Sequence, residues 1–224
     1  MQRLQSVSLR EQALVVVRQA IVSGEIGPGA IYSASALATR LGVSNSPVRE
    51  AMLTLVNQGI MEPVRNRGFR IVPISEHDLD EIGEMRRLLE IPATVALVDR
   101  AGDPDIEAHR PVAEEICAAA RSGDVPTFLE ADRRFHLGLL ALGGNTRLVE
   151  TVARLRDQTR LYGVGTLAEQ GTLQDTAPEH FDILDALLAR DGDAVRTVMT
   201  RHLDHIRGEW AGEPPAEPSF PSAR

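Results

Sequence analysis

A glycine between two short helices with apolar faces constrains the fold more than any other feature of this sequence. The first helix is expected from about Ser35 to Leu41, and Gly42 can end it in a left-handed conformation. The second is expected from about Ser46 to Gly59, with Pro47 in its first turn, where the missing N–H costs nothing. Two helices that cross at a glycine turn form a helix-turn-helix, whose second helix enters the major groove of DNA.

The elements on either side of this pair predict a winged form of the motif. A helix from Leu9 to Ser23 precedes the pair, and Gly24 ends it. Two strand-like runs follow, Ile60–Val64 and Phe69–Pro73, joined by a turn at Asn66-Arg67-Gly68. We therefore expect residues 1–74 to form a winged helix-turn-helix domain of three helices and a β-hairpin wing.

From residue 79 onward the sequence predicts helices and no strand. We expect them at about 78–100, 104–122, 124–142, 145–170, 177–190 and 193–210. A helical domain would then cover 79–210, after a linker at 75–78. Residues 211–224 contain four prolines and are expected to be a disordered tail. The fold class is therefore mainly α, in two domains.

The charge of the chain divides at the expected domain boundary. The net charge of the whole chain is −8, but residues 1–75 hold eight arginines and four acidic residues, which leaves them at +4. A basic head on an acidic body is typical of a protein that binds a polyanion such as DNA. Chance clustering of solvated charges would give the same division, so charge alone leaves both readings open.

Composition places the protein in a reducing compartment. The single cysteine, Cys117, cannot form an intramolecular disulfide. The first 20 residues carry four charged side chains and lack the uncharged core of a signal peptide, and no run approaches the roughly 20 apolar residues of a membrane span. We expect a soluble, cytoplasmic protein with no membrane partner.

Polar residues at the start of the second helix and in the wing are candidates for contact with double-stranded DNA. An asparagine such as Asn45 can pair with adenine in two hydrogen bonds, whereas arginine prefers guanine. Alternatively, Arg49 forms a surface ion pair with Glu50 or Glu62, and the wing arginines are a solvated hairpin tip. The predicted DNA-binding residues are Ser35, Ser44, Asn45, Ser46, Arg49, Arg65, Asn66, Arg67 and Gly68.

One aspartate and three histidines in the acidic half are candidate metal ligands. Asp132 and His136 are spaced i, i+4 and share a helix face, and His180 and His202 lie on two later helices. One carboxylate and three imidazoles suit Zn²⁺ best, or Ni²⁺ or Mn²⁺. Each histidine alone can equally be a packed or exposed residue, and His205 competes with His202 as a ligand.

The head resembles the GntR family of transcription regulators. The resemblance rests on "LATRLGVSNSPVREAMLTLVNQGI" and the following "VRNRGFRIV". It implies a base or phosphate contact for Arg49 and minor-groove or phosphate contacts for the wing around residues 65–68. Two departures, Ala34-Ser35 in place of an acidic-basic pair and Asn45 in place of arginine, imply an atypical operator.

The acidic half resembles the FCD domain of the FadR-type branch of that family. The matching runs are "EMRRLLE", "DRRFHLGLLALGGN", "EHFDILDALLARDGDAV" and "MTRHL". The resemblance implies an antiparallel bundle of six or seven helices, a metal held by Asp132, His136, His180 and His202, and a small organic-acid effector. It also implies effector contact by Arg86, whose alternative is an ion pair with Glu90 or Glu84.

The resemblance further implies a homodimer on a palindromic operator and a regulator, often a repressor, that an effector releases from DNA. A metal-dependent hydrolase and a regulator with a purely structural metal remain as alternatives. We expect coupling between the two domains to pass through the linker Pro73–His77, whose proline limits backbone freedom.

Overall fold

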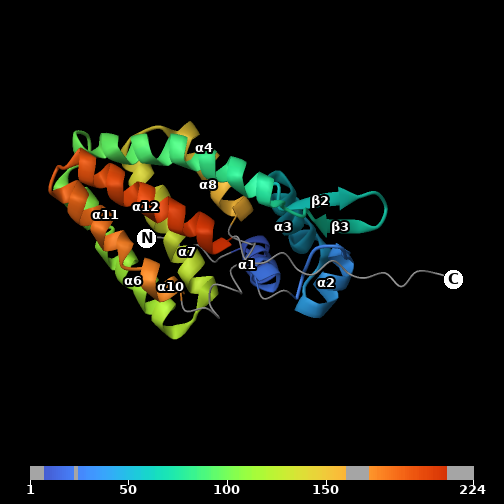
Figure 1. The fold of residues 1–224 in the computed structure, drawn as a ribbon. Coiled ribbons are helices and arrows are strands. Elements are labelled where there is room, and N and C mark those ends of the chain that lie inside the picture. Colours follow the sequence, from blue (N-terminus) through green and yellow to red (C-terminus); the bar gives the residue numbers. More distant parts are fainter. Residues whose placement is uncertain (1–7, 23–24, 160–171, 211–224) are drawn as a thin grey trace, which may run out of the picture.

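The computed structural model describes residues 8–22, 25–159 and 172–210. The N-terminal part holds three helices and a small sheet, on the right in Figure 1. The helices are α1 (Leu9–Val22), α2 (Ala34–Leu41) and α3 (Asn45–Asn57), and the strands are β1 (Ile31–Tyr32), β2 (Met61–Val64) and β3 (Gly68–Ile71). The sheet is antiparallel with strand order β1-β3-β2.

The predicted winged helix-turn-helix is confirmed, with small shifts at the helix starts. α2 begins one residue earlier than expected because the hydroxyl of Ser33 accepts the N–H of Ala36 as an N-cap. Gly42 ends α2 with φ 66°, in the left-handed conformation that glycine adopts without strain. Ser44 is the N-cap residue of α3, but its side chain makes no capping hydrogen bond.

Strand β1 is an element that the sequence did not predict. It is two residues long and pairs with β3 through Ile31 opposite Arg70 and Tyr32 opposite Phe69. Gly68 lies against it, because a Cβ at that position would overlap the backbone carbonyl of Tyr32. The wing is therefore a three-stranded sheet rather than a hairpin alone.

The C-terminal part is helical throughout the described residues. Its elements are α4 (Glu76–Val95), a 3₁₀ turn η1 (Ala96–Val98), α5 (Asp103–Glu107), α6 (Arg110–Ser122), α7 (Val125–Leu142), α8 (Thr146–Thr159), α10 (Thr172–Thr176), α11 (Glu179–Leu188) and α12 (Gly192–Trp210). In the body, α6 packs along α7, α12 along α4 and α11 along α12. Leu97, Ile116, Phe135 and Leu187 lie fully buried in its core.

Several predicted boundaries in this part are wrong. The expected helix 104–122 is two helices, and Pro111 in the first turn of α6 cannot donate the N–H that would continue α5. The expected helix 177–190 begins two residues later, at Glu179 of α11, and is preceded by the short helix α10. Residues 75–78, expected as a linker, cap and begin α4, since Ser75 and Asp78 form a capping box. The end of the expected helix 145–170 and the predicted tail 211–224 lie outside the described residues.

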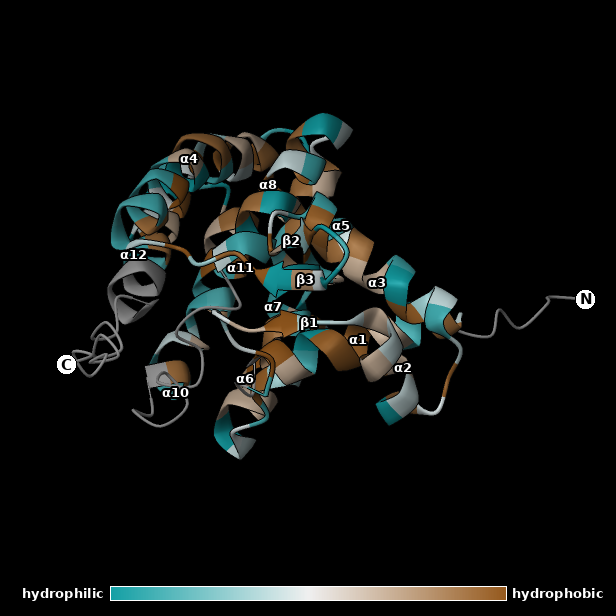
Figure 2. Cartoon of the chain, turned by 90° about the vertical axis from the view of Figure 1, so that its right-hand side faces the viewer, coloured by the Kyte–Doolittle hydropathy of each residue, from teal (hydrophilic) through white to brown (hydrophobic). Residues whose placement is uncertain are grey.

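Close helix packing falls within each part rather than between them. In the head α1 and α2 pack against α3, and the buried side chains of Val17, Met52 and Leu55 form a core separate from that of the body. Figure 2 shows hydrophobic and hydrophilic residues alternating along the helices, as amphipathic helices require. None of the described helices is both long and apolar enough to cross a membrane.

Candidate metal centre and DNA-binding surface

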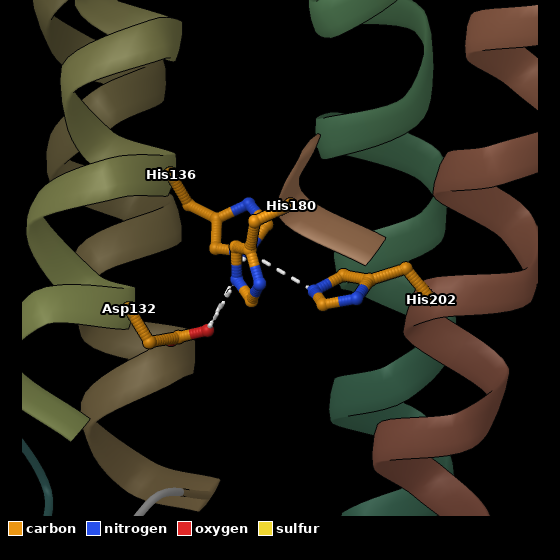
Figure 3. A group of neighbouring side chains, drawn as sticks. All are labelled: Asp132, His136, His180 and His202. Carbon is orange, nitrogen blue, oxygen red and sulfur yellow. Dashed lines mark hydrogen bonds and ion pairs between the residues drawn. The ribbon is translucent and has the colours of Figure 1, made fainter. Parts of the chain in front are cut away.

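Four buried side chains from three helices meet inside the body. Asp132 and His136 extend from successive turns of α7, His180 from α11 and His202 from α12 (Figure 3). One ligand atom from each lies within 4.8 Å of the other three. The structure thus brings together all four residues that the sequence singled out, and such a group can hold a metal ion.

The separations between these atoms approach those of a metal coordination sphere. Nε2 of His180 lies 3.3 Å from Oδ1 of Asp132, and Nε2 of His136 lies 3.5 Å from the same oxygen. The Nε2 atoms of His136 and His202 are 3.0 Å apart. Four ligands about 2.0–2.2 Å from a tetrahedral zinc would be about 3.3–3.6 Å apart. The residues therefore fit a small divalent cation.

Outer hydrogen bonds turn two of the rings toward this centre. Nδ1 of His180 lies 2.9 Å from the carbonyl oxygen of Ala177, and Nδ1 of His202 lies 2.9 Å from Oε2 of Glu179. Both partners are acceptors, so each Nδ1 carries the proton and each Nε2 presents a lone pair to the cluster. Metal-binding histidines are oriented in this way in proteins.

The protonation states also favour a cation. Burial lowers the pKa of His202 to about 4 and lowers that of His136 well below its usual value, with Arg156 adding to the effect at His136. Burial alone would raise the pKa of Asp132. His136, His180 and Arg156 nevertheless hold that pKa well below its usual range. At neutral pH the group therefore contains an ionised Asp132 beside neutral imidazoles at His136 and His202.

A buried network of two arginines and a glutamate lies behind Asp132. Arg156 donates from Nη1 to Oδ2 of Asp132 at 3.2 Å and from Nε to Oε2 of Glu90 at 3.0 Å. Arg86 donates from Nε to Oε1 of Glu90 at 2.7 Å. Burial would raise the pKa of Glu90, but Arg156 and Arg86 lower it to about 2. These four residues carry two positive and two negative charges, so the network is neutral.

Arg86 forms a structural ion pair and also has a hydrogen-bond donor that no described residue accepts from. Its ion pair with Glu90, one of the two alternatives drawn from the sequence, is present. Its Nη2 is buried and is the one buried side-chain nitrogen or oxygen without a hydrogen-bond partner among the described residues. A buried donor without a partner is costly and calls for an explanation such as a missing ligand.

The predicted DNA-binding residues at the start of α3 form an exposed surface. Ser44, Asn45, Ser46 and Arg49 are all exposed, as is Ser35 on α2. The alternative ion pairs for Arg49 are not formed: Glu50 accepts a hydrogen bond from Ser46, and Glu62 pairs with Arg70. Within the described residues, no ion pair involves the Arg49 guanidinium.

The wing presents two arginines at its tip. Arg65 and Arg67 are exposed on either side of Asn66, which adopts φ 57° in the turn. Asparagine tolerates this left-handed conformation better than most residues. At position 68 a glycine is required for a structural reason, because its backbone approaches Tyr32 closely.

Two family models cover most of the chain. Residues 9–71 match the model of bacterial regulatory proteins of the gntR family, and residues 81–205 match the FCD domain. The chain belongs to the GntR family, with an FCD domain. It is therefore a DNA-binding transcriptional regulator of the GntR/FCD type, and the predicted family is confirmed.

Known GntR regulators resemble the chain over nearly its whole length. It is 26% identical to the regulator McbR of Escherichia coli strain K12 over 87% of this chain and 89% of that protein. It is 28% identical to the transcriptional repressor RspR of the same organism, over 88% and 87%. A solved structure of E. coli McbR/YncC superimposes with a TM-score of 0.74 over 89% of this chain and 95% of that one. Both relatives are named as regulators of transcription.

Residues outside the cluster of this GntR regulator support its ligands, and the sequence alone did not single them out for that role. Glu179 directly precedes His180, and an acidic neighbour of a candidate ligand is a local signal that could have drawn attention to it. Arg156 had no such signal, because its partner Glu90 lies 66 residues away and the two meet only in the folded bundle.

Proposed function

We propose that this protein is a repressor whose affinity for its operator is controlled by a small carboxylate effector at a divalent metal in the FCD domain. The observation that carries this proposal is the convergence of Asp132, His136, His180 and His202 to within 4.8 Å of one another in a buried site. The metal would be Zn²⁺, with Ni²⁺ or Mn²⁺ as alternatives. Bound there, it would act as a Lewis acid toward a carboxylate oxygen.

The charges around the site favour an anionic effector. The network of Arg86, Arg156, Glu90 and Asp132 is neutral in itself, so a divalent cation leaves an uncompensated positive charge in a buried region. Buried charge is costly unless paired, and an organic acid would supply the counter-charge. The unpartnered Nη2 of Arg86 is the donor that we assign to this effector.

The head would read DNA through the start of α3 and the wing. Ser44, Asn45, Ser46 and Arg49 would enter the major groove, with Ser35 on the backbone, and Arg65, Asn66, Arg67 and Gly68 would lie at the minor groove or phosphates. One small head makes few phosphate contacts. A homodimer on a palindromic operator would double them. Repression is the direction we favour because the relative RspR is named a repressor.

Among the residues that the structure describes, the hydrolase alternative finds no free general base beside the cluster. Glu90 and Glu179 are the buried carboxylates beside the cluster, and each is held by arginine: Glu90 by Arg86 and Arg156, Glu179 by Arg201. A carboxylate that an arginine holds ionised is a weak base. The arrangement therefore supports a binding site over a catalytic one.

Elemental analysis of the protein, purified without added metal or chelator, tests this proposal. The native chain should carry about one metal per chain, and His136→Ala and His180→Ala should carry none. His77→Ala, whose side chain is 81% exposed and lies outside the cluster, is the matched control and should retain the metal. A native protein without metal would contradict the metal site, while the DNA-binding role would stand because it depends on other residues.

A screen of small carboxylic acids against the metal-loaded protein would then identify the effector. We expect the active acids to raise the melting temperature of the native protein and to fail with Arg86→Gln. If stabilising acids act equally on both proteins, Arg86 does not contact the effector.

A further inference from the structure

Three consecutive residues at the end of α8 face three different parts of the molecule. Arg156 binds Asp132, a member of the metal cluster. Asp157 lies 3.6 Å from Arg18 of α1 in the head. Gln158 lies against Gly59, just after α3, where an added Cβ would be 2.6 Å from its Nε2. One helical turn therefore touches both the candidate metal site and the DNA-binding domain.

On the head side, the contact between Asp157 and Arg18 extends to the end of α3. This is the recognition helix, the helix expected to enter the major groove. Nη2 of Arg18 donates to Oε1 of Gln58 at 3.1 Å, and Gln58 is the C-cap residue of α3. Arg18 thus connects α1, the C-terminus of α3 and Asp157 of the body. The position of the exposed start of α3 depends on how this end of the helix is held, because a helix moves as a rigid rod.

Around this contact the two domains leave open space. A cavity of about 360 Å³ lies between α1 and α7, with Leu14 and Val15 on the head side and Thr127 and Leu129 on the body side. A smaller one of about 180 Å³ lies between Gly59 and the start of α4. Such space leaves room for the head to shift once its polar contacts change.

The charges at the junction allow the contact to open without a large penalty. Asp157 is buried, with a side chain 5% exposed, but it also accepts a hydrogen bond from Nε of Arg133 at 3.0 Å. The Arg18 side chain is 24% exposed and can turn to solvent. If Arg18 leaves, Asp157 keeps a cationic partner, so no unpaired charge is buried. An element with two acceptable arrangements is what a switch requires.

We propose that the end of α8 transmits the state of the metal cluster to the recognition helix through the Asp157–Arg18–Gln58 contact. A cation that binds Asp132 alters the hydrogen bond between Arg156 and Asp132. Because Asp157 lies on the same helical turn as Arg156, its ion pair with Arg18 then changes as well. This inference rests on the proposed metal site. It adds a non-covalent route to the covalent one along Pro73–His77 that the sequence predicts.

Hydrogen exchange with and without added zinc tests this route in the full chain. In the native protein we expect zinc to change amide exchange in α1 and the second half of α3 by about threefold or more. Asp157→Asn should abolish that change while calorimetry still gives zinc affinity within about threefold of native. Arg134→Gln is the matched control, because Arg134 pairs with Glu115 on the surface of the body and touches neither Asp157 nor the head, so it should keep the response.

Arg18→Gln provides an independent variant, because its side chain is partly exposed and its loss threatens the fold less. It should reproduce the Asp157→Asn result, and the double variant should add nothing further. A zinc response in the head that persists in both single variants would overturn the inference. So would calorimetric zinc binding in the native protein without any change in the head. Absence of zinc binding itself would overturn the proposed metal site, and this inference with it, and calorimetry detects that case separately.

Discussion

Oε2 of Glu179 accepts the Nδ1 hydrogen of His202 at 2.9 Å, so a carboxylate at the start of α11 orients a candidate ligand on α12. Arg201 in turn donates to Oε1 of Glu179 at 3.0 Å. The ligand ring is thus fixed by two further residues, neither of which belongs to the cluster. Such outer partners commonly control metal affinity as strongly as ring placement does.

We therefore expect Glu179→Gln to weaken zinc binding by about 10- to 100-fold. Glutamine can offer its amide N–H to Nδ1, which would move the ring proton to Nε2 and remove the lone pair from the cluster. Asp182→Asn is the matched control, since Asp182 pairs with the same Arg201 but its side chain is 52% exposed. Equal zinc affinities for both variants in calorimetric titration would show that Glu179 does not orient His202.

The buried Glu90 predicts a specific acid sensitivity. Its pKa is lowered from 4.5 to about 2 in the folded protein, so its contribution to stability is present above pH 4.5 and is lost as the pH falls toward 2. In chelator, the free energy of unfolding of the native protein should fall over this window by about 3 kcal/mol more than that of Glu90→Gln. Urea titrations at several pH values measure how the free energy of unfolding of each protein depends on pH. The same dependence in both proteins would show that Glu90 is not the source of the acid sensitivity.

Two glycines with left-handed backbones should respond differently to alanine. Gly42, at φ 66°, has no atom within 4 Å of an added Cβ, whereas the same atom at Gly68 would overlap the carbonyl of Tyr32. Gly42→Ala should cost about 1 kcal/mol from backbone strain alone. Gly68→Ala should cost several kcal/mol in addition, because β1 must separate from β3. Comparable losses in urea unfolding would show that β1 does not approach the wing this closely.

Asn45 predicts a preference for adenine at a position where an arginine would prefer guanine. It is exposed in the first turn of α3, where arginine would favour guanine and asparagine favours adenine. Asn45→Arg should shift the sequences selected from a random DNA library toward guanine at one position in each half-site. Ser35→Ala is a control, since Ser35 lies on α2 and is expected at the DNA backbone. Unchanged base preference in Asn45→Arg would rule out base reading by this residue.

The elements of the head were predictable because their signals are local. Gly42 ends α2, Pro47 opens α3 and Asn66 occupies the left-handed turn of the wing, and each acts within a few residues of itself. Strand β1 was not predictable in this way. Ile31 pairs with Arg70 far along the chain, and two residues carry no periodicity.

The candidate site also contains residues with a local sequence signal and residues without one. Helical spacing joins Asp132 to His136. Residue type made His180 and His202 candidates, with a packed or exposed role as the alternative, and the family resemblance then favoured the set of four. The supporting contacts of Arg156 with Glu90 and of Arg18 with Asp157 connect helices distant in sequence. In the sequence, such charged residues cannot be told from ordinary surface charges, because only tertiary packing brings the partners together.

The internal charge balance of Arg86, Arg156, Glu90 and Asp132 has a consequence for how the protein is made. Because these groups neutralise one another, the buried network itself contains no excess negative charge that a cation must cancel before the chain can fold. A newly synthesised chain can therefore reach its native structure ahead of any metal, in contrast to small zinc domains that are unfolded without it. Cellular metal supply would then set how many finished molecules are loaded, not how many survive synthesis.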